Sequence, residues 1–147
     1  MNEAMPAEFW QAVEQFNQGE FYACHDTLEA LWIEAGEPPR SFYQGILQIA
    51  VACYHLLNQN LRGAMILLGE GINRLSRYQP DYGGIDVAQL LSQSAILLTL
   101  VQQTSPEQML DWIEQMKTDI PVDTVEADSD RLLPLPEILT IDSEAPQ

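Results

Sequence analysis

Hydrophobic residues recur at helical spacing through most of the chain, up to about residue 117. Near the start, Phe9, Val13 and Phe16 follow one another at steps of four and three residues. Residues at such steps share one face of an α-helix, whereas a half-buried strand needs alternating polar and apolar residues. Convincing alternation is absent, so the pattern predicts an all-α chain.

Prolines, glycines and capping residues divide this pattern into about six helical segments. We expect the segments to span about residues 6–18, 20–35, 38–59, 61–78, 87–103 and 106–116. Asn60, Asp86 and Ser105 stand where N-caps are expected, because their side chains can accept a bond from the first helical turn. Connections this short favour antiparallel neighbours, so the expected fold is a compact bundle of about five to six antiparallel helices.

The character of the sequence changes after Lys117. We therefore expect a helical domain over residues 1–117 and an acidic, proline-containing tail over residues 118–147. The tail carries eight acidic residues against Arg131 alone, which is typical of disorder. Within it, the stretch LLPLPEILTI is too apolar to act only as a solubilising segment. It either docks back onto the bundle, which we prefer, or engages a protein partner.

The charge of the chain narrows the classes of partner. With 22 acidic and 6 basic residues, the formal net charge is −16. Nucleic acids and anionic membranes are bound mainly through clustered Lys and Arg, so neither is an expected partner. A cation, a metal ion or a basic protein is easier to accommodate. The start MNEAMPAEFW shows no secretory pattern and no apolar run could span a bilayer, so we expect a cytoplasmic protein.

The stretch HDTLEALW places His25, Glu29 and Trp32 at positions i, i+4 and i+7 of its helix. These positions lie within roughly 60° of one another, on the stripe that also carries Phe21 and Leu28. The stripe therefore predicts that imidazole and carboxylate point towards the interior or into a cleft. Groups buried in that way need polar partners.

The next helix offers such partners on a single line of side chains. That line consists of Arg40, Gln44, Gln48, Val51 and His55. Because the short EAGEPP connection makes the two helices antiparallel neighbours, we expect His25 and Glu29 to meet Gln44, Gln48 or His55. The candidate ligand pocket comprises His25, Glu29, Trp32, Arg40, Gln44, Gln48 and His55.

One use of this pocket is to bind a divalent metal ion or a small ligand. An imidazole and a carboxylate at i and i+4 can reach the same ion. His55 is the expected third ligand, and the set His25, Glu29 and His55 suits zinc or iron with open coordination positions. Asp26 is a more distant candidate, because adjacent helical positions diverge by about 100°.

Two other uses remain open. Glu29 can accept hydrogen bonds from His25 and Arg40, with the glutamines completing a network that only locks two helices in register. The protein would then be an interaction module, with the tail engaging a partner.

A hydrolase is a third class, because a histidine beside a glutamate can act as a general base. However, no nucleophile motif accompanies the pair.

The order of these segments also resembles a known family. HDTLEALW matches the HxxxExxW motif of the DUF309 family of small helical proteins. FNQGEFYACHDTLEALW, RSFYQGILQIAVACYHLLNQNLRGA and GINRLSRYQPDYGGIDV resemble its core, over about residues 9–90. The resemblance implies an all-helical domain of unknown function and a suspected metal-binding role for His25 and Glu29. It implies nothing about the tail.

Overall fold

Six α-helices make up most of the described chain. A computed structural model describes residues 5–117 and 133–141. Its helices are α1 (Ala7–Asn17), α2 (Phe21–Glu34), α3 (Pro39–Leu57), α4 (Leu61–Leu75), α5 (Val87–Gln103) and α6 (Pro106–Lys117). A short 3₁₀ turn, η1 (Ser76–Tyr78), follows α4. The predicted all-α bundle is confirmed.

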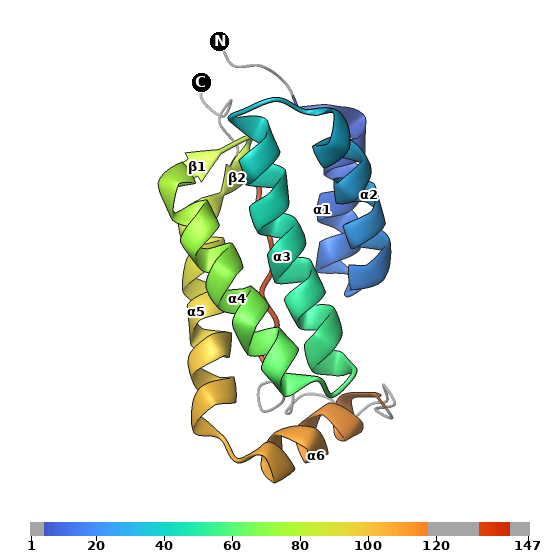
Figure 1. Ribbon diagram of the computed structural model, residues 1–147, viewed down its shortest axis with the longest axis vertical. Coiled ribbons are helices and arrows are strands. Elements are labelled where there is room, and N and C mark those ends of the chain that lie inside the picture. The colour runs from blue at the N-terminus through green and yellow to red at the C-terminus, as the bar shows by residue number, and fades with distance from the viewer. Residues whose placement is uncertain (1–4, 118–132, 142–147) are drawn as a thin grey trace.

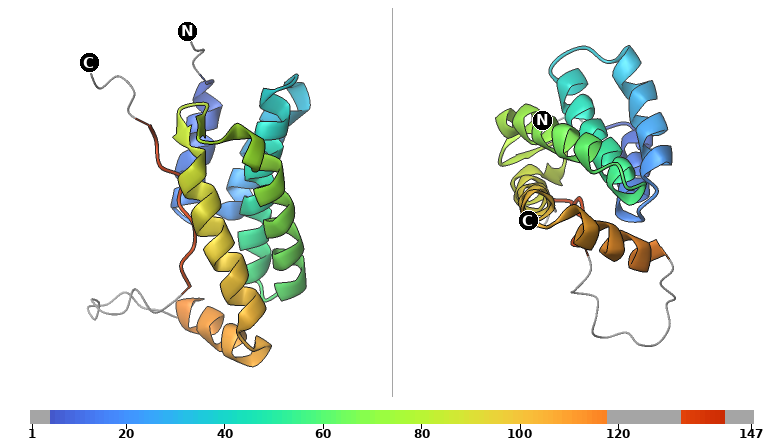
Figure 2. Two further views of the ribbon diagram at one scale, coloured as in Figure 1. Left: turned by 90° about the vertical axis from the view of Figure 1, so that its left-hand side faces the viewer. Right: turned by 60° about the horizontal axis from the view of Figure 1, so that its bottom comes forward.

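The helices pack around α3, which lies at the centre of the bundle (Figure 1). On one side α3 packs against α2, with α1 beyond it, and on the other against α4, which is followed by α5. Helix α6 departs from the antiparallel arrangement, because it lies across the lower end of the bundle (Figures 1 and 2). The central position of α3 agrees with its largely apolar sequence. Its buried side chains include Phe42, Ile46, Ile49, Cys53 and Leu56.

Three helices begin at the capping residues that the sequence indicated. The side chains of Asn60 and Asp86 accept hydrogen bonds from the backbone N–H groups of Gly63 (3.0 Å) and Gln89 (2.9 Å). The hydroxyl oxygen of Ser105 accepts one from Gln108 (3.1 Å). Each bond satisfies a first-turn N–H group that has no partner within its own helix.

Helices α3 and α4 approach closely because each carries a glycine at the contact. A Cβ atom added to Gly45 would lie 2.6 Å from the side chain of Leu75. A Cβ atom added to Gly71 would lie 2.7 Å from Ile49 and 3.1 Å from the backbone oxygen of Gly45. The absence of side chains at positions 45 and 71 therefore sets the spacing of the two helices.

A two-stranded hairpin that we did not expect interrupts the helices. Strand β1 (Asp81–Tyr82) pairs antiparallel with β2 (Ile85–Asp86). The turn between them is formed by Gly83 (φ 60°) and Gly84 (φ 84°), a backbone conformation that glycine adopts without a steric penalty. Strands of two residues are too short to show the alternation by which strands are recognised in a sequence.

The apolar part of the tail docks back onto the bundle. Residues 133–141 run beside α5 (Figure 2), and Leu133 and Ile138 are buried. The side chain of Asn17 accepts a bond from the Ile138 N–H (2.7 Å) and donates one to its carbonyl (2.9 Å). Thr140 forms an antiparallel bridge with Ile85.

Of the two alternatives for LLPLPEILTI, the structure shows docking. The expected disorder of residues 118–132 and 142–147 lies outside the described residues, and a protein partner for the tail stays a prediction.

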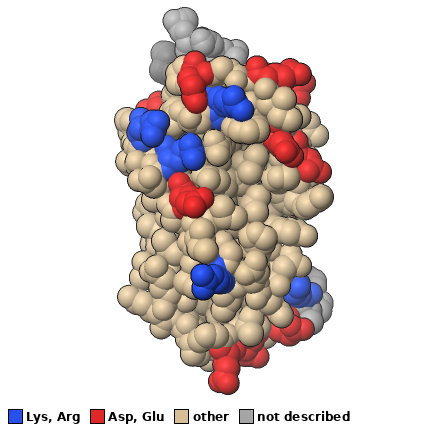
Figure 3. Space-filling view, viewed as in Figure 1, with Lys and Arg blue, Asp and Glu red and all other residues tan. Residues whose placement is uncertain are grey.

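Charged side chains are unevenly distributed over the surface. On the face in Figure 3, basic side chains gather towards the end where α3 begins and α4 ends, with acidic ones beside them. Most of the face between the two ends is uncharged.

Among the described helices, none combines the length and the apolar character needed to cross a bilayer.

Candidate functional site

The side chains of His25 and Glu29 lie on the flank of α2, half in solvent. The buried stripe of the helix is formed by Phe21, Cys24 and Leu28. Each residue advances by about 100°, so Glu29 lies more than a quarter turn from the middle of that stripe. The side chains of His25 and Glu29 are accordingly 29% and 49% exposed. The prediction that both side chains point towards the interior or into a cleft is therefore wrong for Glu29, whereas His25 lines a small cavity between α2 and α3.

His25 also lies between two carboxylates of its own helix. Its ring Nδ1 is 3.2 Å from Oδ1 of Asp26, and its Nε2 is 3.8 Å from Oε1 of Glu29. One ligand atom from each of the three residues can be chosen so that all lie within 4.8 Å of one another. Asp26 reaches the ring despite the helical rotation because Nδ1 is the ring nitrogen nearer the backbone, within range of a short neighbouring side chain.

His55 lies near His25 without joining this cluster. Both histidines line a cavity of about 100 Å³ between α2 and α3, together with Phe21, Tyr22, Val51 and Tyr54. The rings of Tyr22 and Tyr54 bridge the two helices, with 5.4 Å between their centroids. In the described part of the chain, the group of potential ligands within 4.8 Å comprises His25, Asp26 and Glu29. Where His25 and His55 lie, the contact between α2 and α3 is thus mainly aromatic and not the polar contact that we expected.

Gln48 of the candidate pocket faces α4 and not α2, the helix that we expected. Gln48 is buried, and its side chain donates to Oε1 of Glu70 (3.2 Å) and accepts from Nε of Arg74 (3.1 Å). Both partners belong to α4, so the polar network that we expected between α2 and α3 lies between α3 and α4. Gln44 is half-buried on α3. The polar side chains of α3 do not all face the same helix. Their positions span roughly 80° of rotation about the helix axis, which is enough to face two neighbouring helices.

Arg40 and Trp32 do join α2 to α3, but by stacking. The guanidinium carbon of Arg40 lies 4.2 Å from the centroid of the Trp32 ring. The indole Nε1 of Trp32 is buried and has no hydrogen-bond partner among the described residues. Arg40 therefore contacts the face of the tryptophan, and it is not bonded to Glu29, which the structural-network alternative named as one acceptor for it. Trp32 forms part of the wall between the helices.

The two cysteines are excluded as reactive groups by their burial. Cys24 and Cys53 are both free thiols with no exposed surface. Burial raises the pKa of the Cys24 thiol to about 12, and burial also raises the pKa of the Cys53 thiol. A thiol of this kind remains protonated at neutral pH, and the protonated form is a poor nucleophile and metal ligand.

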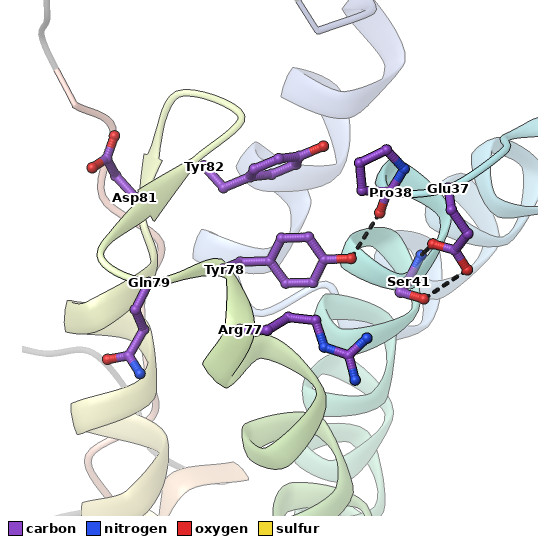
Figure 4. Close-up of a pocket in the computed structure, with 8 residues that line it drawn as sticks. All are labelled: Glu37, Pro38, Ser41, Arg77, Tyr78, Gln79, Asp81 and Tyr82. Carbon is purple, nitrogen blue, oxygen red and sulfur yellow. Dashed lines mark hydrogen bonds between the residues drawn. The ribbon is translucent and has the colours of Figure 1, made fainter.

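A second cavity, which sequence reasoning missed, lies at the other end of α3 (Figure 4). It measures about 590 Å³ and lies between the segments 37–41 and 77–82. Tyr78 joins the two segments, because its hydroxyl donates to the carbonyl of Pro38 (2.7 Å). No pattern along the sequence brings these segments together, since close packing of α3 against α4 is what places them side by side.

Two comparisons with known proteins each match a part of the chain. Residues 9–67 match the family model described as "Domain of unknown function (DUF309)". These residues are less than half of the chain, so the similarity to the family is shown for this part alone. An uncharacterized protein of Bacillus subtilis (strain 168), YpuF, is 37% identical over 59 residues, which make up 38% of this chain and 33% of YpuF. The match thus spans about a third of the relative's length.

The DUF309 match covers α1, α2 and α3 and the first part of α4. It includes His25, Asp26 and Glu29, and it also includes Trp32 and Arg40. The hairpin, α5, α6 and the docked segment 133–141 lie beyond the match. The match therefore includes the cluster of His25, Asp26 and Glu29 and one wall of the larger cavity.

Proposed function

We propose that this protein binds a divalent transition-metal ion at the cluster formed by His25, Asp26 and Glu29. The observation that carries the proposal is the approach of one imidazole nitrogen and two carboxylate oxygens to within 4.8 Å of one another. Compared with the set derived from the sequence, Asp26 takes the place of His55.

The chemistry of the donor set fits such an ion. One nitrogen and two oxygen ligands suit zinc and iron(II), both of which accept imidazole and carboxylate together. Around a tetrahedral zinc ion, ligand atoms lie about 3.4 Å apart, given metal–ligand distances of about 2.1 Å. Asp26 and Glu29 are 61% and 49% exposed, so their carboxylates have the freedom to close the longer separations by rotation.

Three ligands from one exposed helical turn leave the remaining coordination positions to water or to a ligand. A bound zinc ion would act there as a Lewis acid that polarises an oxygen atom. The residues of this chain supply the metal-binding groups, and the adjoining wall of Tyr22 and Tyr54 is available to an apolar part of a ligand. The exposure of the cluster favours a metal that exchanges with solution over a permanently held structural ion.

The test is a zinc titration of the full chain, prepared without a histidine tag, by isothermal calorimetry and elemental analysis. One zinc ion per chain is expected, with affinity reduced by at least about tenfold in His25→Ala and Glu29→Gln. Glu34→Gln removes an exposed carboxylate of α2 outside the cluster and serves as the matched control.

The variant His55→Ala distinguishes the two proposed sets of ligands. If the ligands are His25, Asp26 and Glu29, this variant binds zinc with unchanged affinity. A loss equal to that of His25→Ala would restore His55 as a ligand. Zinc binding that is absent, or is equally strong in the His25 and Glu29 variants, would overturn the proposal.

A further inference from the structure

The larger cavity has the properties of a small-molecule site that is independent of the α2 cluster. It is lined by Glu37, Pro38, Ser41, Arg77, Tyr78, Gln79, Asp81 and Tyr82. Its volume of about 590 Å³ lies within the range of pockets that hold small organic ligands. Figure 4 shows the start of α3 on one side of the cavity and the η1–β1 segment on the other.

The walls of the cavity are held in place before any ligand arrives. The bond from the Tyr78 hydroxyl to the Pro38 carbonyl ties one wall to the other at 2.7 Å. Behind it, the rings of Phe42, Tyr78 and Tyr82 pack together, with centroid separations of 5.3, 4.6 and 4.8 Å. Such packing gives a preformed aromatic surface, which lowers the entropy cost of binding.

One negative charge of the cavity is held in place on Glu37. Its two carboxylate oxygens accept bonds from the hydroxyl (2.8 Å) and the backbone N–H (3.0 Å) of Ser41. These bonds lower the pKa of the Glu37 carboxyl, and the positive charges of Arg40 and Arg77 add to the effect. A carboxylate offers about four lone-pair positions, so Glu37 retains acceptor capacity for a ligand.

The positive charge is supplied by Arg77. Its guanidinium extends towards the end of the cavity where Ser41 and Glu37 lie (Figure 4). In the described ranges, no carboxylate comes within 4.0 Å of it, although acidic residues outnumber basic ones by 22 to 6. Its planar set of five N–H donors matches the two oxygens of a carboxylate.

We propose that this cavity binds a small zwitterion of the α-amino acid type with an apolar or aromatic side chain. The carboxylate of the ligand pairs with Arg77, its ammonium group with Glu37, and its side chain packs on Tyr78 and Tyr82. A simple anion is disfavoured because Glu37 and Asp81 line the same cavity, and a simple cation is disfavoured by Arg77. Adjacent opposite charges select a ligand that carries both.

The proposal is tested by calorimetric titration of the full chain with L-phenylalanine and L-leucine as zwitterions. Two blocked probes accompany them: N-acetyl-L-phenylalanine lacks the ammonium group, and L-phenylalaninamide lacks the carboxylate. Saturable 1:1 binding of at least one zwitterion is expected, with each blocked probe weaker by about tenfold or more than phenylalanine.

Arg77→Gln should weaken binding by a similar factor. Arg62→Gln, which removes an exposed arginine of α4 outside the cavity, should leave it unchanged. Equal binding of the acetylated probe would indicate an anion site, and equal binding of the amide a cation site. Either result overturns the proposal, as does a lack of saturable binding by both amino acids. Thermal unfolding confirms that each variant is folded.

Discussion

The guanidinium carbon of Arg40 lies 4.2 Å from the centroid of the Trp32 ring, which couples the end of the HDTLEALW stretch to the first turn of α3. Because the buried indole N–H has no partner among the described residues, Trp32 contributes through the faces of its ring. This contact, rather than a hydrogen-bonded seam, connects α2 and α3 at the level of Trp32.

A double-mutant cycle should detect this contact. Arg40→Met and Trp32→Leu are combined, and the free energy of unfolding is measured in urea. We expect a coupling energy of about 0.5–1 kcal/mol, the range of cation–π pairs at partly exposed sites. Trp32→Phe should keep part of the coupling, because it retains an aromatic face. A coupling energy indistinguishable from zero would show that the stacking contributes nothing to stability.

The α2 cluster should matter little for folding. His25→Ala and Glu29→Gln should each lower the free energy of unfolding, measured without added metal, by less than about 1 kcal/mol, because both side chains are half in solvent. Gln48→Ala is the contrasting variant, with an expected loss of about 1–3 kcal/mol, because it leaves Glu70 and Arg74 without a buried partner. Equal, large losses in all three would favour a structural role for the cluster.

The glycines of α4 should respond oppositely to substitution. Gly71→Ala forces a methyl group against Ile49 and the Gly45 backbone, and should destabilise the protein by about 1–3 kcal/mol. Gly69→Ala meets nothing within 4 Å and should stabilise it by up to about 1 kcal/mol through helix propensity. Chemical unfolding of both variants measures the difference. If both substitutions stabilise the protein, α3 and α4 can move apart to admit a methyl group at position 71, and Gly71 does not set their spacing.

The docked tail should depend on Asn17. Asn17→Ala removes both bonds to Ile138 and should cost about 1–3 kcal/mol of unfolding free energy. Amide hydrogen exchange should then quicken in residues 133–141 while that of α3 changes little. Asn58→Ala, which removes an exposed bond within its own helix end, is the control. Unchanged exchange in the docked segment would argue against the anchoring role of Asn17.

The buried thiols should make stability fall at high pH. In the unfolded chain a cysteine has a pKa of about 9.0, whereas in the folded protein that of Cys24 is raised to about 12. Below pH 9.0 both states keep the proton, so stability is unaffected; above it only the unfolded chain releases the proton, and stability falls towards pH 12. Cys24→Ala in a Cys53→Ala background should flatten this decline. Rapid labelling of the native thiols at pH 8 would contradict their burial.

The sequence specified the local structure well because the responsible forces act over a few residues. The capping bonds of Asn60, Asp86 and Ser105 each span three positions, so their residue types sufficed. The hairpin was missed because two-residue strands leave no pattern, although Gly83-Gly84 is a turn signal that such a search could use.

The chain by itself therefore determined its helices, their approximate ends, the apolar segment of the tail and the position of His25 and Glu29 on one helix. Tertiary packing decided the rest. It determined that Gln48 bonds to α4, that His55 lies outside the group formed by His25, Asp26 and Glu29, and that Glu37 and Arg77 share a cavity. The physical reason is that helical periodicity fixes direction within a helix, whereas the neighbour that a side chain meets depends on how closely, and at which rotation, two helices pack.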